Sequence, residues 1–467
     1  MIDFTRLDKD VNIIAPYIKQ STISFCDISL GVRFMWRDDF VIDYAIKNQT
    51  LIMKETCPDY ENAFYYPIGA DVEGALKEIE NWTRKNNIPL KFCCIDNFTA
   101  SELVKRYDSV SIINDRDWSD YIYTAEQFKT YSGKKLSGQR NHVNKFKKLY
   151  PDYRFKKIEK ADLNSIKNFL SEFDSRKQFM RWSEAVEQRK VFDLVEKMSE
   201  LNQVGGMLIV GDKVVGFSVG EIVGDTMIVH VEKALTDYDG VYPTLAKEFA
   251  NAFCTENVKY INREEDCGDT GLRISKIQYQ PLEIKEKNIV SVYTLFEKLS
   301  NPIMLCAKDL TISSIEEKDK DRYRELYLDD QLNKWWGYDY REDLKDSAPT
   351  SDYFFNFQLS LKKIKEEYSF AVRLDGEMIG ELVLHNFDYF GGVEMGFRFF
   401  ESAQGKGYAT ISATALKEYV FNVMGARKLK SRCNKLNKPS RALIERLGLK
   451  RVSEDNTHYY FEMKNDN

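Results

Sequence analysis

A short glycine loop in the last third of the chain carries the residues best suited to bind a ligand. An apolar run at 395–400 precedes the loop at 404–409, and a helix-like pattern with one apolar face, at 409–420, follows it. Two glycines let the backbone turn sharply and present consecutive N–H groups, and the dipole of the following helix adds partial positive charge. The sequence therefore predicts a pyrophosphate site, with a plain strand-to-helix turn as the alternative.

The elements expected around this loop follow a plan that the chain repeats. Strand-like runs at 369–374, 378–385 and 393–400 precede the loop, and a strand at 428–433 and a helix from Pro439 follow it. The order meander, glycine, helix, strand recurs earlier: Gly216 to Gly240 spans 24 residues, and Gly380 to Gly405 spans 25. A first copy ends in a strand at 89–95. The sequence therefore predicts an α/β fold of three units, each a mostly antiparallel twisted sheet flanked by helices.

The boundaries of these units are expected at 1–125, 126–298 and 299–467. Residues 108–124 read as a transition between the first two units. A strand is expected near 290–293, ahead of the last unit.

The composition limits the class of protein. The chain has 467 residues, of which 43% are hydrophobic and 30% charged, and this suits several folded domains. A net charge of −5 argues against nucleic-acid binding by the whole surface. The eight cysteines form no CxxC pair and the four histidines have no ligand spacing, so we expect reduced thiols, no metal and a cytoplasmic protein. The sequence shows neither a membrane-span pattern nor a signal-peptide pattern at its start.

One stretch departs from this acidic average. Residues 133–148 contain Lys134, Lys135, Arg140, Lys145, Lys147 and Lys148 and no acid. A solvated helix face is the simpler interpretation of such a run. The functional interpretation is a contact with phosphate groups, such as a tRNA backbone at 134–148.

The last third of the chain resembles the GNAT acyltransferases. The phosphate loop of that family has Gln or Arg, then Gly, then Gly or Ala, where this chain has Gln404, Gly407 and Ala409. Asn434, Asn437, Ser440 and the run at 445–449 are similar to the ending of the ribosomal-protein N-acetyltransferase branch. The resemblance covers about 310–461. It implies an N-acetyltransferase that uses acetyl-CoA.

The same resemblance implies a role for each part of the site. The backbone at 395–399 would pair with the pantetheine arm, and the cofactor-binding set would be Met395, Phe397, Phe399, Gln404, Gly405, Lys406, Gly407, Tyr408, Ala409, Thr410 and Asn437. Glu394 and Glu381 are the candidate bases for the amine proton, because both lie in central strands between apolar neighbours. The alternative is that strand alternation turns each of them towards water. Ser440 is the candidate acid for the leaving thiolate, or a helix cap, with Tyr408 and Tyr419 as other candidate acids.

The acceptor pocket is expected just before the last meander. Trp335 and Trp336 would form its wall, or would pack in the core. Several acids lie nearby and would suit a cationic acceptor, such as a protein N-terminus or a small amine, although they could also belong to a solvated loop: Asp329, Asp330, Asp339, Glu342 and Asp343.

Residues 1–290 carry a second resemblance, to the C-terminal domain of the phosphatidylglycerol lysyltransferases. It rests on the runs at 230–234, 262–266 and 271–279 and on Tyr242. It implies a tandem of GNAT-like units, akin to aminoacyl-tRNA-dependent transferases. The middle loop at 237–242 has two acids, which repel a pyrophosphate, so we expect no usual coenzyme A binding there. Its polar, substrate-binding site would consist of Glu232, Lys233, Asn262, Arg263, Glu265, Arg273 and Lys276.

Together these patterns predict an acetyl-CoA-dependent N-acyltransferase. An acetyl group would pass to a primary amine, on a protein N-terminus or a small molecule, by direct attack of the amine on the thioester. The first alternative is aminoacyl transfer from tRNA by the N-terminal tandem. The second is that the tandem is a binding module without catalysis.

Overall fold

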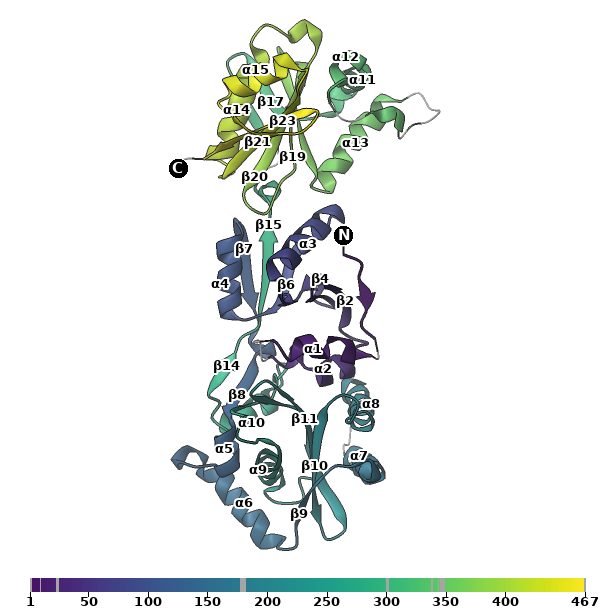
Figure 1. The fold of residues 1–467 in the computed structure, drawn as a ribbon, viewed down its shortest axis with the longest axis vertical. Coiled ribbons are helices and arrows are strands. Elements are labelled where there is room, and N and C mark those ends of the chain that lie inside the picture. The colour runs from purple at the N-terminus through teal and green to yellow at the C-terminus, as the bar shows by residue number, and fades with distance from the viewer. Residues whose placement is uncertain are drawn as a thin grey trace. The chain divides into compact units, whose positions relative to one another are not determined.

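The computed structural model describes residues 2–8, 10–21, 25–176, 182–299, 302–336, 339–342, 344 and 349–465. The chain divides into two compact units, one of residues 1–83, 90–101 and 112–291 and one of residues 84–89, 102–111 and 292–467. Three sheets flanked by helices make up the two units (Figure 1). The predicted α/β class with three mostly antiparallel sheets is confirmed.

The first sheet has the strand order β1-β2-β3-β4-β6-β15-β7, with β5 paired to β3. The bounds of these strands are β1 (Thr5–Arg6), β2 (Val41–Lys47), β3 (Thr50–Cys57), β4 (Tyr60–Phe64), β5 (Ile68–Gly69), β6 (Leu90–Ile95), β7 (Ser109–Asn114) and β15 (Asn288–Tyr293). The helices of this part are α1 (Ala15–Ile18), α2 (Leu30–Met35), α3 (Val72–Lys85) and α4 (Asn97–Arg106). The strand predicted ahead of the last unit is thus β15, and it completes the first sheet.

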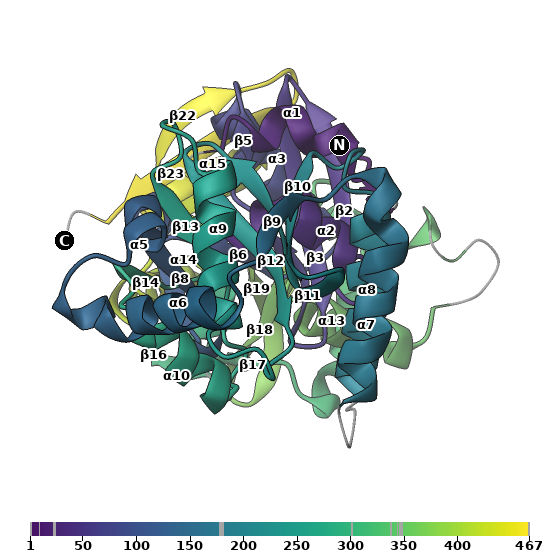
Figure 2. The same cartoon turned by 90° about the horizontal axis from the view of Figure 1, so that it is seen from below.

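The second sheet has the order β14-β8-β13-β12-β11-β10-β9. Its strands are β8 (Asp120–Thr124), β9 (Arg154–Lys157), β10 (Gln203–Val210), β11 (Lys213–Val223), β12 (Thr226–Ala234), β13 (Tyr260–Asn262) and β14 (Glu283–Lys285). Helices α7 (Leu163–Ser175) and α8 (Trp182–Glu196) cover one face of it (Figures 1 and 2). The other face carries α9 (Val241–Phe253), with α5 (Ala125–Thr130) and α6 (Ser137–Leu149) against it. Helix α10 (Thr270–Gln278) follows β13.

The predicted transition at 108–124 therefore contains two strands, β7 and β8, one in each sheet. Their membership was not evident from the sequence, because a short strand with mixed side chains has no clear period. Most of the two sheets lies in one compact unit, and they share one hydrophobic core, in which Phe34, Met53 and Tyr65 pack in the same cluster as Phe217 and Val219.

The third sheet has the order β16-β17-β18-β19-β20-β21-β23-β22. Its strands are β16 (Met304–Ala307), β17 (Leu310–Ser314), β18 (Glu367–Leu374), β19 (Glu377–His385), β20 (Gly392–Phe399), β21 (Lys428–Asn434), β22 (Lys450–Glu454) and β23 (His458–Lys464). The helices are α11 (Lys320–Leu328), α12 (Asp330–Asn333), α13 (Ser351–Lys363), α14 (Tyr408–Asn422) and α15 (Lys438–Arg446). Ala413 and Leu416 of α14 pack with Met395 and Phe399, whereas α11 and α13 build a second cluster with Ala371. The third sheet therefore has helices on both of its faces.

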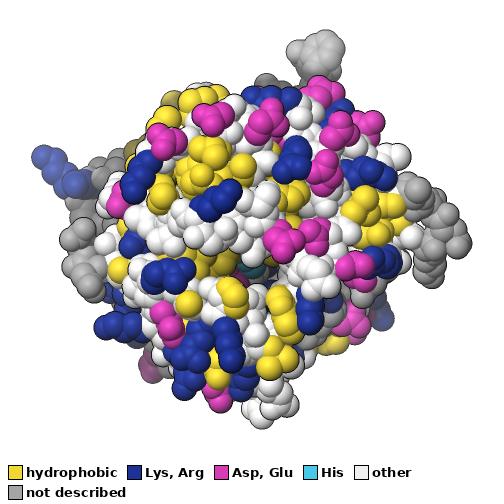
Figure 3. All heavy atoms as spheres, turned by 90° about the horizontal axis from the view of Figure 1, so that it is seen from above, with side chains coloured by type: hydrophobic (Ala, Val, Ile, Leu, Met, Phe, Trp, Pro, Cys, Tyr) yellow, Lys and Arg dark blue, Asp and Glu magenta, His cyan; other side chains and the backbone are white. Residues whose placement is uncertain are grey.

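Short 3-10 helices lie at Val11–Ile14, Cys26–Ile28, Arg116–Trp118, Lys134–Leu136, Lys160–Asp162, Leu295–Lys298, Glu317–Asp319, Tyr340–Glu342 and Glu401–Ala403. Basic, acidic and apolar side chains are interspersed on the face of the C-terminal unit that Figure 3 shows, and no single sign of charge dominates it. Among the residues that the structure describes, no helix combines the length and the apolar character that crossing a bilayer requires.

Candidate active site

The C-terminal sheet opens between β20 and β21. The two strands are parallel and pair at three positions, of which Glu394 with Lys430 is the last. Beyond it, the Ser431 hydroxyl donates to the carbonyl oxygen of Met395 at 2.9 Å, while β20 stays paired with β19 as far as Phe399. One edge of β20 after Met395 is therefore free of strand pairing within residues 349–465. A free edge of this kind can take up an extended amide-bearing chain as an added strand.

The predicted phosphate loop lies at the wide end of this opening. Gly405 and Gly407 have φ angles of 73° and 82°, a left-handed conformation that favours glycine. Helix α14 starts at Tyr408, Gly407 is its N-cap, and no side chain caps it. A Cβ at either glycine would meet nothing within 4 Å, so the loop faces open space. The side-chain amide of Gln404 donates from Nε2 to the carbonyl oxygen of Phe399 at 3.0 Å and links the loop to β20.

The first turn of α14 supplies the donors for an anion. The first helical bond runs from the Ile411 N–H to the Gly407 carbonyl oxygen at 3.1 Å, so the N–H groups of Tyr408, Ala409 and Thr410 have no intrahelical acceptor. Lys406 is exposed beside them. These N–H groups, the helix dipole and one lysine suit a pyrophosphate, so the residues present fit the diphosphate part of coenzyme A. Met395 and Phe399 are buried in the core with α14, and Phe397 packs half-buried against it.

Glu381, one of the two predicted bases, is fully buried in an ion pair. Its carboxylate accepts from Arg398 Nε at 2.7 Å and from the Tyr323 hydroxyl. Arg398 also donates from Nη1 to Asn333 Oδ1 at 2.6 Å. A carboxylate with both oxygens taken by buried donors is held in place and shielded from a substrate amine. The geometry favours a structural role for Glu381 and leaves Glu394 as the better placed acid.

Glu394 lies at the narrow end of the opening. Its carboxylate accepts from Asn386 Nδ2 at 2.9 Å and pairs with Arg432 Nε at 3.3 Å. The imidazole of His385 is opposite on β19, with Nε2 3.8 Å from Glu394 Oε1. His385 carried no signal in the sequence, because its closeness to Glu394 depends on the pairing of β19 with β20. Burial lowers the pKa of His385 and Arg432 lowers it further, which outweighs the effect of Glu394.

The structure brings Trp336 to β20 on the face opposite α14. Its indole lies 4.4 Å from the guanidinium carbon of Arg398, and a Cβ at Gly396 would be 3.4 Å from its ring. Gly396 thus lets an aromatic side chain approach the strand next to Glu394. Trp335 packs instead near Lys334, whose Nζ is 4.9 Å from its ring.

The acids near the tryptophans are partly engaged. Asp330 and Asp339 pair with Arg341, at 2.6 Å and 3.2 Å, and Asp329 caps α12 through the Gln331 N–H at 2.9 Å. The other two predicted acids, Asp343 and the side chain of Glu342, lie outside the described residues.

Asn437 and Ser440 lie at the start of α15. The Asn437 side chain is the N-cap and accepts from the Ser440 N–H at 3.2 Å. Ser440 is therefore half-buried in the first turn of α15, and the alternative that it caps this helix is wrong, because Asn437 is the cap. Tyr419 is buried in α14.

The second sheet, which belongs to the predicted middle unit at 126–298, has a corresponding opening between β12 and β13, but side chains of these residues bridge it. Strands β12 and β13 pair in parallel up to Ile228 and Asn262. Just beyond, His230 Nδ1 lies 2.7 Å from Glu264 Oε1, and Arg263 pairs with Glu232 at 2.7 Å. A bulge makes His230 the extra residue of β12, since Val229 and Val231 pair with adjacent residues of β11. Two ion pairs thus bridge the opening in the second sheet, whereas the opening between β20 and β21 in the C-terminal unit is not bridged in this way.

The middle phosphate-loop position is covered as well. Gly240 is the N-cap of α9 with a φ of 82°, as Gly407 is of α14. A Cβ there would lie only 2.2 Å from the carbonyl oxygen of His142 in α6. Asp237 pairs with Arg176, and Asp239 pairs with Lys145 at 2.8 Å. Helix α6 therefore covers the start of α9, and this geometry supports the expectation that no coenzyme A binds there in the usual way.

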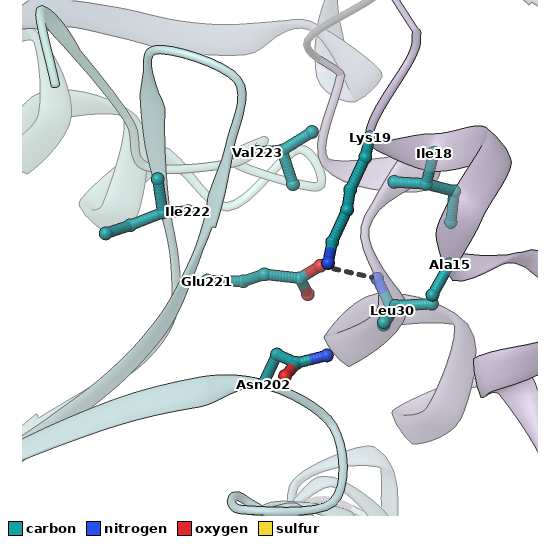
Figure 4. Close-up of a pocket in the computed structure, with 8 residues that line it drawn as sticks. All are labelled: Ala15, Ile18, Lys19, Leu30, Asn202, Glu221, Ile222 and Val223. Carbon is teal, nitrogen blue, oxygen red and sulfur yellow. Dashed lines mark hydrogen bonds between the residues drawn. The ribbon is translucent and has the colours of Figure 1, made fainter. Parts of the chain in front are cut away.

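Glu221 of β11 joins the two halves of the tandem. Its buried carboxylate accepts from the N–H groups of Leu30 and Gly31, at 3.2 Å and 2.9 Å, and from Gln203 Nε2 at 2.8 Å. A small cavity of about 30 Å³ adjoins it, and Lys19 points towards the carboxylate there (Figure 4). Burial disfavours a charged His230, but its ion pairs with Glu221 and Glu264 outweigh this and raise its pKa to about 9. The imidazolium is therefore a fixed cation between two glutamates.

The remaining predicted residues of the middle unit lie near one another but are paired internally. Lys276 Nζ donates to the carbonyl oxygen of Arg263 at 2.6 Å, Arg273 pairs with Asp266 at 2.7 Å, and Lys233 pairs with Glu187 at 2.8 Å. Asn262 Nδ2 donates to Asp120 at 2.6 Å. The loop after β13 is thus held from several sides: Arg273 and Lys233 are in ion pairs, and Lys276 is held by backbone carbonyl oxygens.

Glu265 belongs to a buried cluster that the sequence did not suggest. Lys287 Nζ lies 2.5 Å from Asp27, 2.8 Å from Asp120, 3.5 Å from Glu265 and 3.2 Å from Cys26 Sγ. The donor atoms of Cys26, Asp27 and Asp120 have a spacing that would suit a metal, but the Lys287 ammonium lies among them. Burial raises the pKa of the Cys26 thiol, and nearby carboxylates raise it further. The cluster is thus an ion pair network with a protonated thiol.

Comparison with known proteins agrees with both resemblances. Residues 21–290, more than half of the chain, match the family model described as phosphatidylglycerol lysyltransferase, C-terminal. The chain belongs to this family. Residues 309–450 match the model of the acetyltransferase (GNAT) domain. The chain is therefore an acyltransferase that joins a lysyltransferase-type tandem to a GNAT acetyltransferase domain, and GNAT domains in general use acetyl-CoA.

Individual relatives each cover part of the chain. An uncharacterised protein of Mycoplasmoides gallisepticum is 25% identical over 232 residues, which are 47% of this chain and 69% of that protein. A conserved protein of unknown function from Bacteroides thetaiotaomicron has a solved structure that is 29% identical, with a TM-score of 0.56, covering 63% of this chain and all of that one. The uncharacterised N-acetyltransferase YnaD of Bacillus subtilis is 32% identical over 88 residues, 18% of this chain and 51% of that protein.

Proposed function

We propose that the GNAT domain transfers the acetyl group of acetyl-CoA to a primary amine, on a protein N-terminus or a small molecule. The open phosphate loop at Gly405 and Gly407 carries this proposal, because the matching loop of the middle unit is covered by α6. The N–H groups from Gly405 to Thr410 would hold the pyrophosphate, and the free edge of β20 would hold the pantetheine arm. Coenzyme A, when bound, supplies the acetyl group as an activated thioester.

The side chains around β20 would serve the amine. Trp336 offers an aromatic wall on the face that also carries Glu394 and His385, so an amine that enters beside Trp336 reaches the narrow end of the opening. A base there would take the proton that the amine must lose. Ser440, in the first turn of α15, is the candidate donor to the leaving thiolate.

Calorimetric titration of the whole chain with acetyl-CoA tests this proposal. We expect one site per chain, because the loop at Gly405 and Gly407 is open whereas helix α6 covers the matching loop of the middle unit. Release of the free thiol should then depend on an added amine, which a panel of peptides and polyamines would identify. Two binding sites would contradict our interpretation of the middle unit, and the absence of binding would contradict the proposal itself.

A second candidate, aminoacyl transfer from tRNA by the tandem, is favoured by helix α6 and the residues before it. Lys145 and Lys147 pair with Asp239 and Glu248, at 2.8 Å and 3.5 Å. Lys134, Lys135 and Lys148 are exposed and have no ion pair within the described ranges. They are available for phosphate contacts.

Charge reversal tests this candidate. If the tandem binds tRNA through this face, changing Lys134, Lys135 and Lys148 to Glu should weaken binding at least tenfold. The slope of the logarithm of the binding constant against the logarithm of the salt concentration should become smaller by about one for each lost contact. The same change at the exposed Lys308, Lys363 and Lys450 alters the net charge equally and should have little effect. Equal weakening by both triples would mean non-specific attraction. Binding of tRNA without aminoacyl transfer would favour a binding module.

A further inference from the structure

His385 and Glu394 face each other at the point where β20 and β21 separate. They are direct partners in the β19–β20 ladder, and Glu394 is also the last residue of β20 that pairs with β21. Beyond Met395 this edge of β20 is free of strand pairing within residues 349–465. Any group that lies along this edge with its reactive end inward would therefore end beside this pair.

The two side chains are unequal as proton acceptors. Glu394 already pairs with the Arg432 guanidinium at 3.3 Å through one carboxylate oxygen and accepts from Asn386 Nδ2 at 2.9 Å through the other, so both of its oxygens are engaged. Among the described residues, the one ion pair of His385 is that of Nε2 with Glu394, at 3.8 Å, and 22% of its side chain is exposed. Three charged or titratable groups lie around His385: Glu394 from β20, Arg432 from β21 and Tyr460 from β23. The Tyr460 hydroxyl donates to Asp455 at 2.6 Å.

The middle unit provides an internal comparison. Glu221 follows Gly216 by five residues, as His385 follows Gly380, and His230 Nε2 lies 3.6 Å from Glu221. There the same two residue types occupy the opposite strands. That pair is almost fully buried, with side-chain exposures of 1% and 5%, and Glu264 holds the imidazole from the other side. His230 is fixed as a cation, whereas His385 stays partly open and its environment favours the neutral ring.

We propose that His385 is the catalytic base of the GNAT domain and that Glu394 positions it. This inference rests on the proposed acetyl transfer and assigns its proton acceptor. An amine arrives as an ammonium at neutral pH, and one of its protons would pass to His385 Nε2 and then to water. The nitrogen lone pair would form the N–C bond as the C–S bond breaks. The second amine proton would leave from the product, and the thiolate would take a proton from Ser440 or solvent.

The pH dependence of kcat separates the two candidate bases. Because the neutral ring is the active form, kcat should rise with pH through a midpoint below the ordinary His value of about 6.5 and then level off. His385→Gln should lower the plateau by about 100-fold to 10,000-fold and remove the rise. Glu394→Gln should keep a rise, moved to lower pH because a negative neighbour is lost, with a reduction of about tenfold. The opposite pattern, in which only Glu394→Gln removes the rise, would overturn the proposal.

Two controls keep the test decisive. His458→Gln changes the other histidine of this domain, on β23, and should leave the profile unchanged. Chemical rescue by imidazole is the second control. The activity of His385→Gly should increase in proportion to the concentration of added imidazole. If this variant still binds acetyl-CoA and imidazole restores no activity, His385 is not the base. If the native chain neither binds acetyl-CoA nor releases thiol, the proposed function fails. If it does both and His385→Gln is fully active, only this inference fails.

Discussion

Gly407→Asp should reduce acetyl-CoA affinity at least 100-fold, about 2.7 kcal/mol, while the chain stays folded. The substitution places a carboxylate at the N-cap of α14. Two like charges 4 Å apart repel by about 4 kcal/mol at an effective dielectric of 20, so one carboxylate suffices to oppose the pyrophosphate. It would also accept hydrogen bonds from the N–H groups that bind the anion. The first unit shows this arrangement, because Asp71 at the start of α3 accepts from the Gly74 N–H at 2.9 Å.

Gly376→Asp is the matched control for this variant. Gly376 has a φ of 87° in the turn between β18 and β19, and a Cβ there also meets open space. The backbone strain and the added charge are therefore nearly the same, but the turn is outside the phosphate loop. Calorimetry should give native affinity for the control, and circular dichroism should show folded protein for both. Native affinity in Gly407→Asp would mean that the loop does not bind the pyrophosphate.

Lys287→Met should destabilise the N-terminal tandem by about 3–5 kcal/mol, the usual result of removing one partner from a buried ion pair. The Lys287 side chain is 6% exposed and lies within 3.5 Å of three carboxylates. Without its ammonium these carboxylates would face one another in a buried place. Urea unfolding followed by circular dichroism measures the difference. Lys213→Met is the control, because Lys213 pairs with Glu172 at 2.7 Å on the surface and should cost no more than about 1 kcal/mol.

This loss should depend on pH. Burial raises the pKa of Glu265 to about 7 in the native chain, although Lys287 opposes the shift. A carboxyl with a raised folded pKa stabilises the fold below its unfolded pKa of about 4.5, and this contribution is lost as pH rises to 7. Removing the ammonium raises carboxyl pKa values further, so the gap between Lys287→Met and the native chain should be wider at pH 8 than at pH 5.5. A constant gap would show that the carboxylates do not feel the lost charge.

The parts of the site that the sequence predicted are those encoded in adjacent residues. The phosphate loop at 404–409 combines turn chemistry and a helix start in six positions, so its glycine conformations and its place before α14 could be anticipated. His385 could not, because its link to Glu394 depends on which residues of β19 and β20 pair. Lys287 and Cys26 are 261 residues apart and meet only in the folded tandem. Helix α4, which follows β6 directly, was also missed.

Glu381 illustrates a second limit. Strand alternation predicts which face of the sheet a side chain lies on, but not whether a buried cation lies next to it. Arg398, on the neighbouring strand, is such a cation and pairs with Glu381. The same holds for Arg263 and Glu232, which the sequence suggested as ligand contacts and which bond to each other. Polar residues chosen for their type alone cannot be separated into those that serve a ligand and those that serve the fold.

Strand β15 has a consequence for how the protein is made. It lies between β6 and β7, and Asn288 donates to the carbonyl oxygen of Ile95, 193 residues earlier. During synthesis β6 and β7 leave the ribosome long before β15 has been made. The first sheet therefore lacks the strand between β6 and β7 until nearly 300 residues have been synthesised. Such non-local closure is slow and exposes strand edges to misassembly. Nascent chains halted near residue 250 should therefore need a chaperone, and the two halves of the tandem should not be separable by cutting at residue 125.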